Sequence, residues 1–332
     1  RQIHRGRRLI EALIDITLLG FLVLIAIAAI MLTDMFAVVM LFGVYSLLTA
    51  TLFMDLDAVD VAFTEAAVGA GVTTVLMLSS LHLTKRWEAL PRRNPLLALL
   101  AVGVTGAALL YAVLDAPLLG DPSAPVHQHV TPRFIEQGQA EVGMPNLVTA
   151  VLASYRGYDT FGETVVIFTA GLAVLLLLGI QDDPRLRPGV SAIGDQLVLR
   201  SVVKVLLPLI LLYGLYVQFH GDFGAGGGFQ AGVIFATGFV LYDLVFGEGS
   251  ARAVIPPGWL HRLAALGVLI YGAVGVYSLL LGRPFLDYSA LADDPVHGQH
   301  LGVLLVELGV GIAVFSVVLL IFYAFAGRGR RQ

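Results

Sequence analysis

The chain contains no cysteine and carries little charge. Of its 332 residues, 13% are Asp, Glu, Lys or Arg, against roughly 25% in a typical soluble domain. The lack of cysteine excludes disulfide bonds, thiolate metal sites and iron–sulfur ligation by this chain. The formal net charge is −4 and the sequence has no large basic cluster, so nucleic acid is not an expected partner. We find no phosphate-binding loop, Rossmann fingerprint or nucleophile arrangement, and we expect neither an enzyme active site nor a cofactor.

Long apolar runs fill the chain instead. Hydrophobic residues make up 58% of it, and the mean hydropathy is +0.86. A helix needs about 20 apolar residues to cross a bilayer. The sequence therefore predicts an all-α, polytopic membrane protein with about nine transmembrane helices. The predicted spans are 9–32, 35–54, 59–83, 95–115, 161–180, 197–219, 228–247, 260–281 and 299–326.

Two shifts in composition divide the chain into three predicted modules. Residues 1–94 form a three-helix module, and residues 95–180 form a two-helix module around a proline-rich loop at 116–160. That loop is too polar to cross the membrane, although its 146–154 part is predicted to be an amphipathic helix at the interface. A turn-rich stretch then opens a four-helix module at 181–332.

The distribution of Lys and Arg predicts the orientation in the membrane. Most of the 20 basic residues fall on the inner side if the C-terminus is inside, as the positive-inside rule requires. The basic stretch at 1–8 then falls outside, against the rule. The orientation of the first hairpin is therefore left open.

Glu65 is an acidic residue inside a predicted membrane helix. An ionisable group at the bilayer centre costs roughly 2.5–3.5 kcal/mol, so a proton or cation path is the default hypothesis. Gly69 and Gly71 follow it, and glycine permits a π-bulge whose freed carbonyls can hold water. The alternative is a polar contact between Glu65 and a neighbouring helix. Asp60, nearer the membrane surface, is interpreted as a solvated helix end.

Further ionisable groups lie in or near other predicted spans. Glu307 repeats the pattern of a buried carboxylate followed by glycines, which is typical of either a transport group or a helix–helix hydrogen bond. Lys204 precedes Pro208, and it is interpreted either as a relay in a proton path or as a side chain that snorkels to the interface. Glu163, at the entry to the 161–180 span, is interpreted as a mouth residue.

A glycine-rich turn precedes the predicted span at 228–247. Its backbone N–H groups are available to an anion or to water, but tight packing of a re-entrant turn is the simpler interpretation. His220 and Asp222, just before it, form a candidate proton-accepting pair at the membrane face. The consecutive glycines are Gly226, Gly227 and Gly228. The other histidine pairs are interpreted as solvated loop residues rather than metal ligands; they are His127 with His129, and His297 with His300.

Three motifs resemble one family of ion-transport proteins. The segment Asp60-Val61-Ala62-x-Thr64-Glu65-Ala66-x-Val68-Gly69-Ala70-Gly71 resembles a module at the C-terminal end of the large subunit of Mrp-type multisubunit Na⁺/H⁺ antiporters. In membrane-bound hydrogenases that module is a separate protein. Arg156-Gly157-Tyr158-Asp159-Thr160-x-Gly162-Glu163 resembles the next module of the same tail. The region 204–311 resembles the MnhB-type component of these antiporters, although Ala225 stands where that family favours proline.

The resemblance covers nearly the whole chain and implies a subunit of a cation/proton antiporter or a related ion pump, in the plasma membrane of a bacterium or archaeon. The implied partners are other antiporter-type membrane subunits, the lipid bilayer, Na⁺ and H⁺. The long ion-translocating domain of the family is missing from the sequence, so we expect it in a partner. The implied ion path comprises Glu65, Glu307, Lys204, Glu163 and His220, with Gly69, Gly71, Gly226, Gly227 and Gly228 as supporting backbone.

Two other functions remain open at this point. The chain is alternatively a scaffold that joins larger pumping subunits, including those of a redox-driven pump, and has no path of its own. A self-sufficient secondary transporter is a weaker alternative, because such folds have inverted repeats and broken helices that the sequence does not show.

Overall fold

The computed structural model describes residues 2–81, 83–89, 95–118, 120–180, 197–247 and 249–326. In these residues nine helices are long and apolar enough to cross a membrane, which confirms the predicted all-α polytopic fold. They are α1 (Gln2–Met31), α2 (Met35–Asp55), the continuous run of α3 (Val59–Glu65), η1 (Ala66–Thr73) and α4 (Thr74–Leu81), α5 (Pro95–Leu114), α9 (Gly157–Leu178), α10 (Leu197–His220), α11 (Gly228–Phe246), α13 (Pro257–Leu280) and α14 (Pro295–Ala326).

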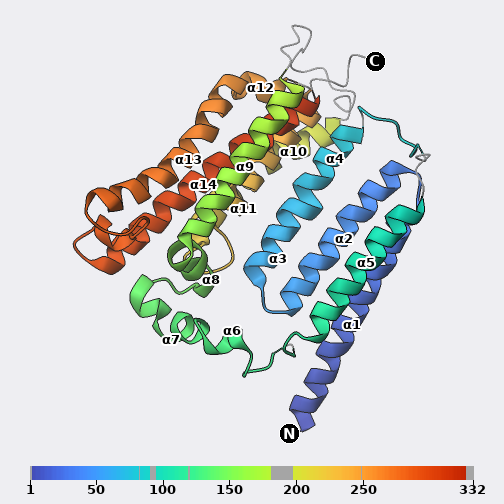
Figure 1. The fold of residues 1–332 in the computed structure, drawn as a ribbon. Helices are drawn as coiled ribbons and strands as arrows, with labels where there is room; N and C mark the ends of the chain where they lie inside the picture. The colour runs from blue at the N-terminus through green and yellow to red at the C-terminus, as the bar shows by residue number, and fades with distance from the viewer. Residues whose placement is uncertain are drawn as a thin grey trace.

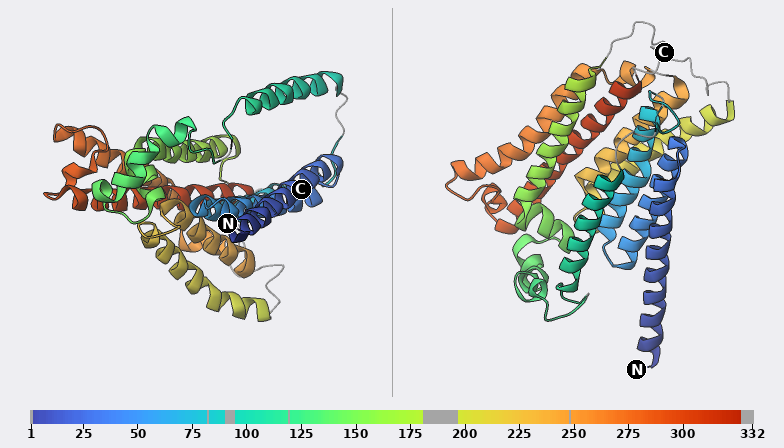
Figure 2. Two further views of the ribbon diagram at one scale, coloured as in Figure 1. Left: turned by 90° about the horizontal axis from the view of Figure 1, so that it is seen from below. Right: turned by 45° about the vertical axis from the view of Figure 1, so that its right-hand side comes forward.

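Shorter helices lie between the spans. They are α6 (Pro125–Gln128), α7 (Thr131–Val142), α8 (Leu147–Thr149), η2 (Ala150–Tyr155), α12 (Ser250–Val254) and η3 (Tyr288–Leu291). Figure 1 shows α6, α7 and α8 gathered at one end of the long helices, with α12 and the C-terminal end of α14 at the other. The long helices run side by side, while α5 stands apart from the others (Figure 2).

The core lies where α11 and α14 pack together, with α13 and α9 beside them. About half of the apolar window of α11 and of α14 is buried, 56% in each, whereas none of α5 is. Glycines permit this close approach of helix backbones, as is common in membranes. A Cβ added at Gly232 would lie 2.6 Å from the carbonyl oxygen of Gly311, and one at Gly267 would lie 2.5 Å from that of Gly309.

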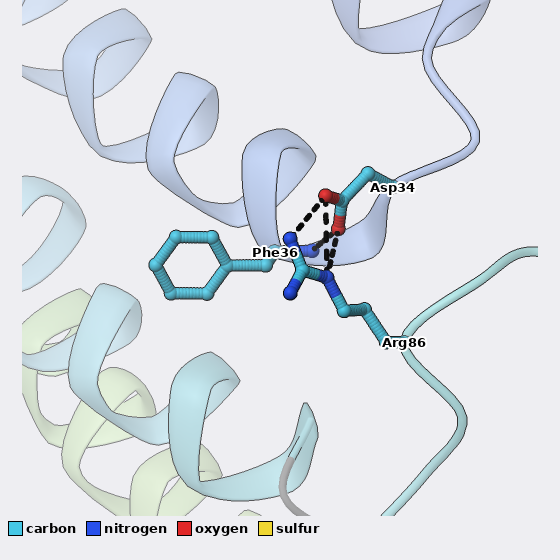
Figure 3. Close-up of polar contacts among 3 residues, drawn as sticks. All are labelled: Asp34, Phe36 and Arg86. Atoms are coloured by element: carbon cyan, nitrogen blue, oxygen red, sulfur yellow. Dashed lines mark hydrogen bonds and ion pairs between the residues drawn. The ribbon is translucent and has the colours of Figure 1, made fainter.

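An ion pair fastens the turn between α1 and α2 to the segment that follows α4. The Arg86 guanidinium donates to both carboxylate oxygens of Asp34, at 2.7 Å from Nη2 to Oδ2 and 3.1 Å from Nε to Oδ1 (Figure 3). Asp34 also caps α2 by accepting the Phe36 N–H. The pKa of Asp34 is below its usual range, chiefly because of the hydrogen bond from Arg86. This contact lies at the end of the bundle opposite α6–α8.

We expect Gly267→Ala to destabilise the bundle. The new methyl group meets backbone atoms of α14 that cannot move aside, and overpacking of this kind costs about 1–3 kcal/mol. Gly258→Ala on the same helix is the matched control, because nothing lies within 4 Å of its added Cβ. The thermal unfolding midpoints of the two purified variants measure the difference. Equal midpoints would contradict the packing described here.

We expect Asp34→Asn to lower the unfolding midpoint at neutral pH. A lowered folded-state pKa means that the carboxylate stabilises the fold at pH values above its unfolded pKa, and that this contribution is lost as the pH falls through the folded pKa. The difference in unfolding midpoint between Asp34→Asn and wild type should therefore become smaller at acidic pH. Arg86→Lys should also lower the midpoint, because lysine keeps the charge but cannot make the bidentate hydrogen bonds of arginine to Asp34. A difference in midpoint that does not change with pH would argue against a stabilising ion pair.

Candidate functional site

A cavity of about 560 Å³ lies between α3, α9, α11 and α14, at the end of the bundle that carries α6–α8. Its walls bring together segments that are far apart in the sequence. The polar residues that line it are Asp60, Thr64, Thr149, Thr160, Glu163, Thr164, Gln230 and Glu307. Three carboxylates therefore face one space, together with hydroxyl and amide groups able to bind water or a hydrated cation.

Glu307 lies in the cavity wall beneath the glycine-rich turn. A Cβ added at Gly221 or Gly227 would lie 3.2 or 3.1 Å from Glu307 Oε1, and one at Gly228 would overlap the Glu307 carbonyl oxygen. The turn packs tightly on this carboxylate because glycine leaves room for it. Gly227 also has a φ of +125°, a conformation that other residues rarely adopt. The turn is therefore tightly packed, as the sequence indicated, and it borders a carboxylate.

Asp60 lies in the cavity wall, and its interpretation as a solvated helix end is wrong. Asp60 Oδ1 accepts from Asn146 Nδ2 and from the Gly226 N–H, both at 3.4 Å. The sequence did not show this because the partners come from two distant segments that fold over the start of α3. Asp60 is thus a candidate site residue that the sequence analysis missed.

Asn146 joins the proline-rich loop to the glycine-rich turn. Its Nδ2 donates to the carbonyl oxygens of Gly221 and Gly224 at 3.1 and 2.9 Å, and its Oδ1 caps α8 by accepting the Val148 N–H. Thr149 Oγ1 donates to the same Gly221 oxygen at 2.6 Å. The region predicted as an amphipathic helix at 146–154 forms α8 and the π-helical η2. It supplies part of the cavity wall.

Glu163 and Gln230 complete the polar lining. Glu163 is exposed on α9 and borders the cavity. Gln230 is buried on α11, and its Nε2 donates to Thr64 Oγ1 at 2.9 Å, which links α11 to α3 across the wall. Together these side chains connect an exposed edge to a buried interior.

Glu65 does not line the cavity. It is half-buried and accepts a hydrogen bond from Ser46 Oγ of α2. Successive residues of a helix are rotated by about 100°, so Thr64 faces α11 while Glu65 faces α2. This is the polar helix–helix contact that was the alternative interpretation of Glu65.

The helix after Glu65 has the π geometry that its glycines permit. Residues Ala66–Thr73 form the π-helix η1, and Thr74 Oγ1 donates to the Gly69 carbonyl at 3.4 Å. A Cβ at Gly69 would overlap Ser46 Oγ and would lie 2.6 Å from Glu65 Oε1. Gly69 therefore makes room for the Ser46–Glu65 contact. Gly71 lies in the same π-helical segment.

Two more of the predicted path residues, besides Glu65, lie outside the cavity. Lys204 is exposed on α10, and the His220 ring stacks on Tyr216 with 4.8 Å between ring centroids. Asp222 pairs with His300 rather than with His220, at 3.5 Å from Oδ2 to Nδ1. The histidine spacing alone indicated a solvated loop residue at His300, although the last predicted span begins at 299. The helix begins at Pro295, so His300 lies on it.

Family models match consecutive parts of the chain. Residues 20–86 match MbhD and residues 91–197 match MbhE, two components of MBH, and residues 198–320 match a domain related to the MnhB component of Na⁺/H⁺ antiporter. These ranges fall in the same order as the three predicted modules.

Two curated proteins are similar in sequence. A Rhizobium meliloti protein named as a probable K⁺/H⁺ antiporter A/B subunit is 29% identical over 89% of this chain and 32% of its own length. The chain thus spans about a third of that relative. A Staphylococcus aureus protein, mnhB2, named as a component of an antiporter, is 31% identical over 40% of this chain and 96% of its own length.

Two solved structures have a similar fold. A chain of the Mrp complex from Dietzia sp. DQ12-45-1b superposes with a TM-score of 0.76 at 24% identity, covering all of this chain and 39% of that one. A chain of the membrane-bound sulfane sulfur reductase, an archaeal respiratory membrane complex, gives a TM-score of 0.55 at 28% identity, covering 69% of this chain and 97% of that one. The chain belongs to the family of multisubunit Mrp-type antiporter subunits, with an MnhB-related domain at residues 198–320.

Proposed function

We propose that this chain is a membrane subunit of a multisubunit cation/proton antiporter, in which the cavity forms part of the ion path. The observation that carries the proposal is that Asp60, Glu163 and Glu307 line one cavity, although they come from three different helices. Intramembrane carboxylates that face a polar cavity are typical of ion and proton paths. Transport rather than catalysis is the function that this arrangement serves.

The electrostatics of the cavity favour exchange of a proton for a cation. Asp222 and Asp60 both lie close enough to Glu307 for their charges to act on it. Neighbouring carboxylates repel one another when all are ionised, so either a proton or a cation lowers the energy of the group. A site that must hold one or the other can couple two opposing ion gradients. We propose Na⁺ or K⁺ as the cation, the two ions named for the relatives.

The predicted orientation gives the path a direction. With the C-terminus inside, the end of the bundle that carries α6–α8 faces outward, and the cavity opens on the outer side of the plasma membrane. We place Glu163 at the outer mouth and Glu307 further inside, since Glu163 is exposed and Glu307 is half-buried. We propose that other membrane subunits provide the continuation inward, because the family consists of multisubunit complexes.

The second candidate function is a scaffold, and α5 favours it. None of the apolar window of α5 is buried against the rest of the chain. An exposed apolar helix of this kind can contact another protein of the complex or lipid. Under this alternative the carboxylates would be polar contacts between helices, and transport would not depend on their charge.

We expect Glu307→Gln to reduce transport to background while the complex still assembles. Glutamine has nearly the same shape but neither binds a proton nor carries the charge. Glu136→Gln, on the exposed face of α7, is the matched control and should keep the wild-type rate. Cation-driven proton movement in membrane vesicles, normalised to the amount of assembled complex, measures the effect. A wild-type rate in Glu307→Gln would leave the scaffold as the remaining function.

We propose that the charge of Glu65 serves the ion path, in addition to the contact that Glu65 makes with Ser46. Glu65→Gln keeps an oxygen that can accept the Ser46 hydrogen bond, so it removes the charge and spares the contact. Ser46→Ala does the opposite. Transport per assembled complex should therefore fall sharply in Glu65→Gln and only modestly in Ser46→Ala. The reverse order would show that Glu65 serves the helix–helix contact alone.

A further inference from the structure

Asp222 and His300 form an ion pair that does not itself line the cavity. His300 is on the second turn of α14, and Asp222 is in the turn between α10 and α11. Their side chains are 38% and 30% exposed, so both reach solvent at the end of the bundle that carries the cavity. Histidine is the side chain whose ordinary titration falls nearest to neutral pH.

The pair is close to Glu307, one of the three carboxylates that line the cavity. His300 precedes Glu307 by seven residues, which is two helical turns or about 10 Å along one face of α14. Gly221, the neighbour of Asp222, packs near the Glu307 carboxylate, and a Cβ there would lie 3.2 Å from Glu307 Oε1. The charge of Asp222 acts on Glu307 as well. Asp222 is therefore near the half-buried Glu307 on one side and the partly exposed His300 on the other.

The backbone around the pair is held in place. The Asn146 N–H donates to the Asp222 carbonyl at 3.0 Å, and a Cβ added at Gly143 would lie 3.0 Å from His300 Nε2. The glycine at the end of α7 thus leaves space for the imidazole. The other titratable groups near this position are Asp60 at the start of α3 and His220, whose Nε2 would lie 2.9 Å from a Cβ at Gly224.

We infer that Asp222 and His300 form a proton-exchange pair that connects Glu307 to the surrounding water. A proton leaves the Glu307 carboxyl group for the Asp222 carboxylate by way of water. His300 takes it at Nδ1 and becomes the imidazolium, which then releases a proton to solvent. The same steps in reverse order return a proton to Glu307. No other reactant is needed, and the inference rests on the transport function proposed above.

Variants of His300 distinguish a proton-exchange pair from a contact that only supports the structure. His300→Gln keeps a side chain that donates a hydrogen bond to Asp222 but cannot carry a proton at neutral pH. His300→Ala leaves a space that free imidazole can enter. His297→Gln and His297→Ala are the matched controls, because His297 is exposed on the first turn of the same helix.

The experiment measures cation-driven proton movement by the assembled complex in vesicles, with and without added imidazole. We expect both His300 variants to slow transport at least about tenfold, as is usual on loss of a positioned proton carrier, and the His297 variants to match wild type. Imidazole should restore His300→Ala and leave His300→Gln slow. A wild-type rate in His300→Gln, or a slow His300→Ala that imidazole does not restore, would overturn the inference.

Glu307→Gln separates this inference from the function on which it rests. If Glu307→Gln abolishes transport while His300→Gln transports normally, only the exchange pair is wrong. If Glu307→Gln transports normally, the proposed path itself is wrong.

Discussion

The close contact of α11 with α14 is the constraint on which the rest of the structure depends. Backbone meets backbone at Gly228 and Gly232, where any added Cβ would collide with α14. In lipid no hydrophobic effect drives helices together, so such close packing supplies much of the association energy. The same contact brings the glycine-rich turn onto Glu307. Helix packing and the geometry of the candidate site therefore share one cause.

The rotation of a single helix divides the acidic residues of α3 and its continuation between two environments. Asp60 and Thr64 are four residues apart and face the cavity, whereas Glu65 faces Ser46 of α2. The π-helix η1 begins directly after Glu65 and changes the register of every residue beyond it. A change between π and α geometry here would rotate the start of the helix relative to its end.

The proline-rich loop gives the site its enclosed shape. Asn146 and Thr149 bind carbonyl groups of the glycine-rich turn, and the helices that follow form part of the cavity wall. The family models assign this loop and the turn to different components of related complexes, MbhE and the MnhB-related domain. The candidate site consequently combines residues from two stretches that match different family models. In a chain that joins them, the hydrogen bonds of Asn146 become internal to one protein.

The sequence by itself determined the spans, the fold class and the family. Apolar runs of about 20 residues leave few alternatives to membrane helices, and the glycine and carboxylate motifs are local patterns. It also singled out Glu307 and Glu163, because a charged residue within or beside an apolar span can be recognised from the linear sequence alone. Only the tertiary structure decided which groups meet. Asp60 lines the cavity and Asp222 pairs with His300, whereas Lys204 and Glu65 do not line the cavity. The physical reason is that the direction of a side chain depends on helix rotation and on partners that are distant in the chain, and local sequence encodes neither.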